Sequence, residues 1–227
     1  MNYKFDFASV VAFWPDFLHG AWLTIQLSAA ATLLGFVLGT LCAIGRRSRH
    51  AWLRRACGFY VEVIRNTPLL VQVFLFYFGF ASVGLAMPAT VAAIIVLVIN
   101  VGSYTTEIMR AGFDSVPAGQ LEAAECLGLS RAQVYWHVVL QPAMERVYPS
   151  LTSQFVLLML ATSITSQIST EELTAVANRV QSMTFRAFET YLAVAVFYLL
   201  LSLLMRLGFW LLGLVIFPRR RKLGTAL

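Results

Sequence analysis

Five stretches of this 227-residue chain are each about as long and as apolar as a membrane-spanning helix. A helix needs about 20 mostly apolar residues to cross the hydrocarbon core of a bilayer. The stretches cover about residues 21–44, 60–80, 87–108, 148–168 and 191–217. Composition agrees, because 59% of the residues are hydrophobic and only 12% are charged, whereas soluble domains carry roughly 25% charged residues. The sequence therefore predicts an all-α, polytopic membrane protein that forms one transmembrane domain over residues 1–227.

Positive charge is distributed unevenly among the loops. Arginines crowd the turn after the first stretch, and four basic residues follow the last one: Arg219, Arg220, Arg221 and Lys222. Five passes place both segments on the same side of the membrane, and basic loops favour the cytoplasmic side. We therefore expect the N-terminus outside and the C-terminus in the cytoplasm. This bias also accounts for the net charge of +6 without a nucleic-acid partner.

The polar segment 119–149 separates the third stretch from the fourth. The alanines, leucines and glutamates that precede Gly128 favour a helix. Gly128 stands where a left-handed glycine ends such a helix, and Leu129 can supply the apolar contact that follows. Ser130, with Gln133 three residues later, is typical of a capping box that opens a second helix. The segment is thus predicted to be a helix–glycine–helix elbow presented to a partner, or else an ordinary amphipathic connector.

Ionisable residues inside spanning segments are unfavourable and suggest a function. Glu62 and Arg65 are three residues apart near the start of the second stretch, just before Pro68. Glu107 and Arg110 repeat this spacing at the end of the third stretch. Because residues three apart are neighbours on a helix surface, we expect two structural ion pairs, or gate elements of the bundle, rather than substrate ligands.

Two groups of polar residues are candidates for a substrate pathway. Asn100, Tyr104 and Glu107 share one face of the third stretch, which should point into the bundle. Five polar side chains crowd the outer half of the fourth stretch: Thr162, Ser163, Thr165, Ser166 and Gln167. The alternative for the first group is hydrogen bonding between helices. For the second, serine and threonine can bond to carbonyls of their own helix.

Beyond the fourth stretch, Ser169 and Glu172 have the spacing of another capping box. Four apolar residues then recur at helical spacing: Leu173, Val176, Ala177 and Val180. They predict a short amphipathic helix at the outer membrane surface, or a simple connector. Cys42, Cys57 and Cys126 are expected to be reduced thiols, because the predicted topology places them on or near the cytoplasmic side.

Signatures of catalysis are absent from the sequence. It contains no GxxxxGK[ST] phosphate-binding loop. The three histidines, His19, His50 and His137, lack the spacing of metal ligands. We therefore expect no catalytic residues, no metal site and no cofactor in this chain.

Glu122, Ala123, Ala124 and Gly128 resemble the EAA loop of bacterial ABC importer permeases, in which Glu-Ala-Ala is followed after three further residues by glycine. The resemblance implies a cytoplasmic coupling loop over about residues 111–147. One departure stands near its end: the polar amino acid branch of the family usually reads Leu-Pro-Gln-Ala, and this chain has Leu-Gln-Pro-Ala over residues 140–143.

Other motifs resemble the same branch and occur in the same order. They are the segments 65–72, which reads RNTPLLVQ, 104–110, Thr162-Ser163 and Glu172-Leu173. In the fourth stretch, members often carry lysine followed by aspartate or asparagine, where this chain has Leu160-Ala161. This departure suggests that substrate charge is recognised by another subunit.

The resemblance implies a type I ABC importer permease fold in the bacterial inner membrane, with a periplasmic N-terminus. It implies two cytoplasmic ATPase subunits that bind ATP and Mg, a second permease subunit, identical or homologous, and a periplasmic binding protein that delivers a polar amino acid. Coupling to the ATPase is implied for six residues: Glu122, Ala123, Ala124, Gly128, Leu129 and Ser130. The alternatives are a same-fold permease for another small solute and a channel that works without ATP.

Overall fold

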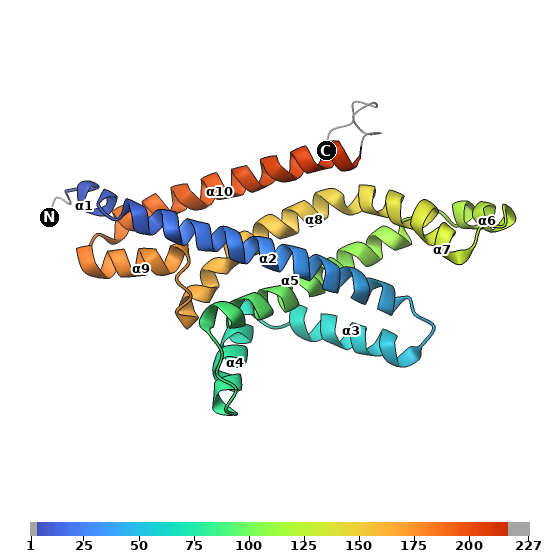
Figure 1. The fold of residues 1–227 in the computed structure, drawn as a ribbon, viewed down its shortest axis with the longest axis horizontal. Helices are drawn as coiled ribbons and strands as arrows, with labels where there is room; N and C mark the ends of the chain where they lie inside the picture. The colour runs from blue at the N-terminus through green and yellow to red at the C-terminus, as the bar shows by residue number, and fades with distance from the viewer. Residues whose placement is uncertain (1–3, 218–227) are drawn as a thin grey trace. The chain divides into compact units, whose positions relative to one another are not determined.

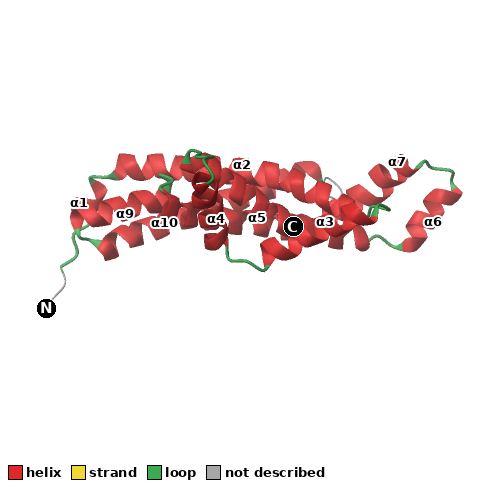
Figure 2. Cartoon of the chain, turned by 90° about the horizontal axis from the view of Figure 1, so that it is seen from below, coloured by secondary structure: helices red, strands yellow, loops and turns green. Residues whose placement is uncertain are grey.

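The computed structural model describes residues 4–217, so the basic run 219–222 lies outside the described residues. Helices are the only regular structure in the described part of the chain (Figures 1 and 2). Their order is α1 Ala8–Val11, α2 Trp14–Arg46, α3 Ala51–Arg65, α4 Leu69–Ser82, α5 Ala89–Asp114, α6 Ala118–Cys126, α7 Arg131–Gln133, the π-helix η1 Val134–Leu140, α8 Gln141–Ala161, the 3₁₀ helix η2 Thr162–Ile168, α9 Leu173–Thr184 and α10 Ala187–Ile216.

Four helical segments of the described chain are long and apolar enough to cross a membrane. They are α2, α5, α10 and the continuous run Val134–Ile168. A fifth candidate is the pair α3 and α4, whose axes meet at 106°. The predicted all-α, polytopic membrane fold is therefore confirmed.

The second stretch, expected as one helix over residues 60–80, is broken where α3 meets α4. Pro68 has no amide hydrogen to continue a helix, and it disfavours helical geometry at Thr67 before it. The Gln72 amide nitrogen donates to the carbonyl of Thr67 at 3.0 Å and to its hydroxyl at 2.8 Å. The same residues that resemble a family motif thus form a turn between two helices.

Contacts within the chain form two compact units, each built from separated segments. Among the described residues, the first contains 4–33, 67–98 and 155–207, and the second contains 34–66, 99–154 and 208–217. Each unit is described below by itself.

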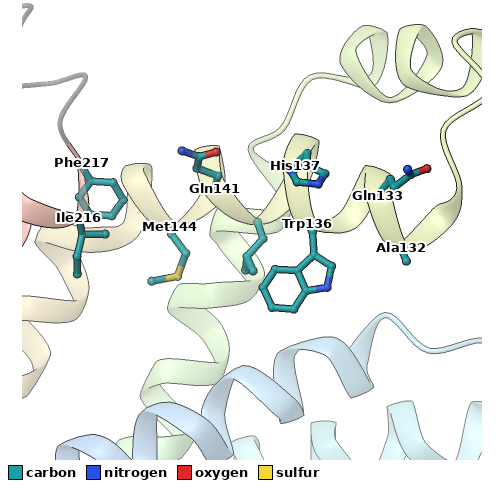
Figure 3. Close-up of a pocket in the computed structure, with 9 residues that line it drawn as sticks. Ala132, Gln133, Trp136, His137, Gln141, Met144, Ile216 and Phe217 are labelled. Atoms are coloured by element: carbon teal, nitrogen blue, oxygen red, sulfur yellow. The ribbon is translucent and has the colours of Figure 1, made fainter.

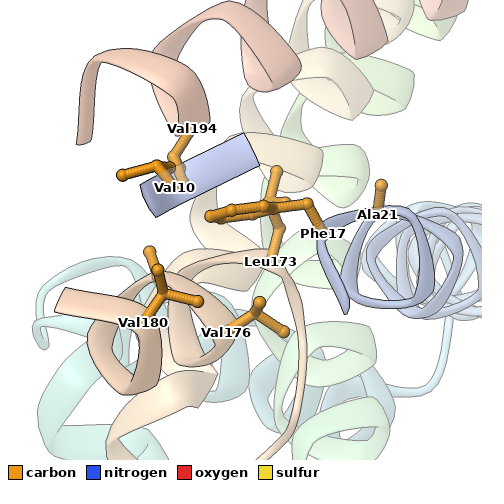
Figure 4. Close-up of a cluster of buried hydrophobic side chains, with 8 residues drawn as sticks. Val10, Phe17, Ala21, Leu173, Val176, Val180 and Val194 are labelled. Atoms are coloured by element: carbon orange, nitrogen blue, oxygen red, sulfur yellow. The ribbon is translucent and has the colours of Figure 1, made fainter. Parts of the chain in front are cut away.

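The core of the first unit forms around α9 (Figure 4). Its buried residues are Val10, Phe17, Ala21, Leu173, Val176, Ala177, Val180 and Val194. The predicted apolar face of this helix is therefore confirmed. Its predicted start is wrong, because Glu172 and not Ser169 caps it, accepting a hydrogen bond from the Ala175 amide at 3.0 Å. Ser169 instead ends η2 in a left-handed conformation, with φ of 63°.

The core of the second unit depends on close approach between α2 and α5. A Cβ atom built on Gly39 would lie 2.5 Å from Cβ of Thr105, so only glycine fits there without movement. Tyr60 of α3 joins this contact by donating to the carbonyl of Ile99 at 2.6 Å. Cys57 is buried nearby, opposite Gly45, and all three cysteines are free thiols.

Candidate functional site

The elbow is built around the backbone of Gly128, whose φ is +74°. Its amide donates to the carbonyl of Glu125 at 2.9 Å, and the amide of Leu129 donates to that of Ala124 at 3.2 Å. These two bonds are the Schellman arrangement that ends a helix at a left-handed residue. Apart from the two neighbouring residues, no atom of the described chain lies within 4 Å of a Cβ built at Gly128. Glycine is thus needed for the backbone conformation and not for space.

The second arm of the elbow opens with the predicted capping box. The Ser130 amide donates to Oε1 of Gln133 at 2.9 Å, and the Gln133 amide donates to Oγ of Ser130 at 3.4 Å. Helix α7 then runs through η1 into α8 without a break. The predicted helix–glycine–helix elbow is confirmed.

Most of the elbow's side chains face outward. Glu122, Ala123 and Ser130 are exposed, Leu129 is half-buried, and Ala124 is buried. Leu127 is 79% exposed at the tip, beside Gly128. An exposed leucine next to a turn held by two backbone hydrogen bonds, with the exposed carboxylate of Glu122 five residues before it, is suited to contact with another protein.

A hollow of about 570 Å³ runs along η1 toward the end of α10 (Figure 3). Trp136, Met144 and Phe217 are among its apolar lining residues, and the Trp136 side chain is largely exposed. Tryptophan is enriched where a membrane meets water. The exposed Trp136 in this hollow is therefore consistent with η1 lying at the membrane–water boundary, between the elbow and the spanning part of α8.

A network of charges occupies the end of α5 in the second unit. Glu107 accepts hydrogen bonds from Arg46 and, at 2.7 Å, from Arg110. Arg110 also pairs with Asp114 at 3.0 Å, and Asp114 pairs with Arg47 at 2.8 Å. The predicted Glu107–Arg110 pair is confirmed. The spacing of residues in the sequence did not predict the two ion pairs that join α5 to Arg46 and Arg47 of α2, because no local pattern relates residues about 60 positions apart.

The other predicted pair, Glu62 with Arg65, is not formed in the structure. Glu62 accepts instead from the side-chain amide of Asn66 at 3.1 Å. The Arg65 guanidinium lies over the ring of Tyr104, 5.3 Å from its centroid, in a cation–π contact. Arg65 is the last residue of α3, so its side chain reaches α5 in preference to the preceding turn.

Asn100, Tyr104 and Glu107 are half-buried on α5. The fully buried face of that helix contains other residues, among them Val101 and Thr105. The three pathway candidates therefore lie at the edge of the buried face of α5. Two of them already contact arginines: Tyr104 contacts Arg65, and Glu107 contacts Arg46 and Arg110. All three belong to the second unit.

The polar group of the fourth stretch forms η2 in the first unit. Thr162 and Thr165 are buried, Ser163 and Ser166 are half-buried, and Gln167 is exposed. Each of the four hydroxyls donates at 2.7 Å to the carbonyl three residues before it. Because residues three apart eclipse each other in a 3₁₀ helix, the two serines share a face. Their donors are satisfied locally, and their lone pairs can still accept.

A buried polar cluster at the start of α9 was not predicted. Glu172 is completely buried and accepts from the Tyr198 hydroxyl at 2.7 Å. The hydroxyls of Thr174 and Tyr198 lie 2.9 Å apart. Burial raises the pKa of Glu172, and its hydrogen bonds oppose part of that rise. A carboxylate directly before the apolar pattern was a signal for a cap, but nothing in the sequence pointed to Tyr198.

The apolar spans and the exposed elbow between them define a polytopic membrane protein. The family described as "binding-protein-dependent transport system inner membrane component" matches residues 35–214, and the chain belongs to it. The resemblance seen in the sequence is thereby confirmed.

Curated relatives include amino acid transport permeases. The octopine transport system permease protein OccM of Rhizobium radiobacter is 33% identical, over 92% of this chain and 90% of its own length. The glutamine transport system permease protein GlnP of Escherichia coli strain K12 is 34% identical, over 89% of this chain and 93% of its own. The probable glutamine ABC transporter permease protein GlnM of Bacillus subtilis is 35% identical, over 85% and 89%.

Solved structures share the fold. A chain of "an amino acid ABC transporter with histidines" superposes with a TM-score of 0.86 at 34% identity, covering 93% of this chain and 99% of that chain. A chain of the inward-facing MetNI methionine ABC transporter gives a TM-score of 0.75 at 18% identity, over 90% and 98%. The latter likeness shows the fold alone.

Proposed function

We propose that this chain is the membrane-spanning subunit of an ABC importer that carries a polar amino acid across the bacterial inner membrane. Family membership supports the transport role. The names of the relatives, which include octopine and glutamine permeases, support an amino acid as the solute. The Arg65-Asn66-Thr67-Pro68 segment supports the same branch, and it forms the turn between α3 and α4.

In the proposed assembly the chain is one transmembrane domain with its N-terminus in the periplasm and its C-terminus in the cytoplasm. A second permease subunit, identical or homologous, completes the pathway, and a periplasmic protein delivers the amino acid. Two cytoplasmic ATPase subunits bind ATP and Mg and supply the energy. This chain has no ATPase site of its own and is not an enzyme.

The elbow is the observation that carries the proposal. The elbow exposes Glu122 on α6, and it exposes Leu127 at the turn held by the two Schellman bonds of Gly128. A short helix of this kind suits a groove on a partner. When ATP closes the ATPase pair, the rigid elbow would transmit the movement to α8, because α7, η1 and α8 form one continuous helical run. ATP binding would thereby shift the population between inward-open and outward-open states.

Replacement of Gly128 tests this role. Gly128→Asp adds a side chain and a negative charge at a left-handed position that glycine favours, and it should abolish uptake and ATPase stimulation while the protein still inserts into the membrane. Gly119→Asp is the matched control, because Gly119 lies in α6, has no positive φ and has open space around it. If Gly128→Asp transported as well as Gly119→Asp and the unaltered chain, the elbow would not be the coupling element. The alternative function, an ATP-independent channel, predicts a different result: the purified chain alone would pass substrate down a gradient without any ATPase.

For the substrate pathway we propose the polar face of α5, with Asn100, Tyr104 and Glu107, and η2, with Thr162, Ser163, Ser166 and Gln167. Glu62, Arg65, Pro68 and Arg110 are proposed as structural or gate residues. Leu160 and Ala161 supply no charge, so substrate charge would be recognised by the second permease or by the binding protein. Uptake of a panel of radiolabelled amino acids, with that binding protein present, tests the solute class, and uptake of only a non-amino-acid solute would contradict it.

The position of the charge-recognition site has its own test. The double variant Leu160→Lys with Ala161→Asp introduces the charged pair that is common in the branch. A change in the Km for uptake would place this segment at the substrate. Unaltered transport would place recognition elsewhere, as proposed.

A further inference from the structure

A second hollow, of about 490 Å³, lies beside the turn between α2 and α3 in the second unit. Apolar side chains of three elements form much of its wall: Leu41, Leu53 and Phe113. Arg47, Ser48, Arg49 and Tyr135 add polar groups. No carboxylate of the described residues lines the hollow itself, although Asp114 pairs with Arg47 beside it. The hollow therefore combines an apolar surface with two positive charges.

The two arginines differ in what they already bind. Arg47 donates to Asp114 at 2.8 Å and remains partly exposed. Arg49 is exposed and has no ion pair among the described residues. One guanidinium is thus held in place, and the other is available for an anion.

Tyr135 brings a hydroxyl to the same hollow. The hydroxyl oxygen is buried and has no hydrogen-bond partner within the described part of the chain. The ring is held by Phe113, with centroids 5.8 Å apart. A buried hydroxyl left without a partner is unfavourable. A ligand that brought an acceptor oxygen to this hydroxyl would remove that penalty.

The hollow lies where apolar sequence gives way to charge. The apolar run of α2 ends near Ile44, and the arginines begin two residues later. Trp52, near the start of α3, is 69% exposed, as expected of a tryptophan at the membrane–water boundary. The ligand most accessible at such a boundary is a phospholipid, and basic pockets between helix ends are suited to anionic headgroups.

We propose that this hollow binds an anionic phospholipid, with its phosphate between Arg47 and Arg49 and within reach of the Tyr135 hydroxyl. An acyl chain lies against Leu41, Leu53 and Phe113. This site goes beyond the proposed function, because it is independent of the solute and of the ATPase contact. It also connects the α2–α3 turn to η1, so lipid charge acts on the helical run that follows the elbow.

Native mass spectrometry of the purified full chain, titrated with phosphatidylglycerol in detergent, measures the affinity of the tightest site. Arg49→Gln is expected to weaken that site about fivefold, from roughly 1 kcal/mol for each basic residue near an anionic surface. Arg54→Gln is the matched control, because Arg54 is also exposed near the same turn but does not line the hollow. It should leave the affinity unchanged.

Two further variants separate a defined site from loss of structure. Arg49→Lys keeps the charge and should retain most of the binding. Tyr135→Phe keeps the ring and its packing and should weaken binding without changing the net charge.

Other results would overturn the assignment. Equal losses in Arg49→Gln and Arg54→Gln would show diffuse attraction without a site. Binding of phosphatidylcholine as tight as that of phosphatidylglycerol would show that the anion is not recognised. Full displacement by glycerol phosphate would assign the hollow to a soluble phosphate. Loss of the lipid when the ATPase subunits assemble would make it a protein contact surface.

Discussion

The hydroxyl of Tyr198 donates a 2.7 Å hydrogen bond to Oε2 of Glu172, a carboxylate with no exposed surface. The other carboxylate oxygen accepts from the amide of Ala175 in the first turn of α9. Two donors from two helices therefore hold one buried acid. The bond fixes the start of α9 to the middle of α10 within the first unit.

Tyr198→Phe removes one of these donors and leaves a buried acceptor without its partner. We expect the free energy of unfolding to fall by about 1–3 kcal/mol, measured by thermal or denaturant unfolding in detergent. Tyr191→Phe is the control, because Tyr191 also joins α10 to α9, donating to Asn178 at 2.7 Å, but is exposed. Its effect should stay within about 0.5 kcal/mol. Equal effects would mean that burial of the Glu172 pair is unimportant.

The same carboxylate makes stability depend on pH. Burial raises the pKa of Glu172 in the folded chain above its value of about 4.3 in an unfolded chain. The folded state then binds the proton more tightly, so stability falls as pH rises through the interval between the two pKa values. Its contribution is fully present below the unfolded pKa and is lost above the folded one.

We therefore expect the melting temperature to decline with rising pH from about 4 upward, measured by a series of thermal melts. Glu172→Gln cannot titrate there and keeps an oxygen for the cap, so this decline should flatten. Glu171→Gln removes a neighbouring exposed negative charge and serves as the control. A slope that Glu172→Gln leaves unchanged would assign the effect to other groups.

Glu107 receives two guanidinium groups, from Arg46 and Arg110, and its side chain is 19% exposed. Glu107→Gln leaves both cations with a neutral partner, so we expect a loss of about 1–2 kcal/mol, between the values for exposed and buried pairs. Chemical denaturation in detergent measures it. Glu62→Gln is the control, because Glu62 is exposed and makes no ion pair within the described residues. A comparable loss there would argue against the network.

The contact between α2 and α5 depends on the absence of a side chain at Gly39. A Cβ there would lie 2.5 Å from Cβ of Thr105 and 2.7 Å from the carbonyl oxygen of Gly102. Gly39→Ala should therefore destabilise the protein by about 1–3 kcal/mol, as overpacking does. Gly79→Ala, in α4 with nothing within 4 Å, should be neutral or slightly stabilising. Melting temperatures of the two variants compare them directly.

The elbow could be predicted because its determinants are local. Gly128, Ser130 and Gln133 lie within six residues, and their hydrogen bonds are those that the residue types favour. The break after α3 was only partly predictable. Pro68 marks its position, but no local pattern specifies the angle of 106°.

Interactions between distant segments could not be predicted from spacing. Glu62–Arg65 and Glu107–Arg110 have the same separation, yet only the second pair forms. The difference lies in partners from other helices: Arg46 joins Glu107, whereas Tyr104 contacts Arg65. Similarly, Glu172 could be expected near a helix start, but its bond to Tyr198 spans 26 residues.

The π-helical geometry of η1 bears on the proline that comes shortly after it. Hydrogen bonds in a π-helix span five residues instead of four, so its turns hold an extra residue. Pro142 comes two residues after the end of η1. The carbonyl that its ring would crowd in an α-helix, that of Val138, lies in this wider turn. If this turn had α-helical geometry, the ring of Pro142 would press against that carbonyl. The wider turn of η1 therefore gives Pro142 room within the helical run that leads from the elbow into α8.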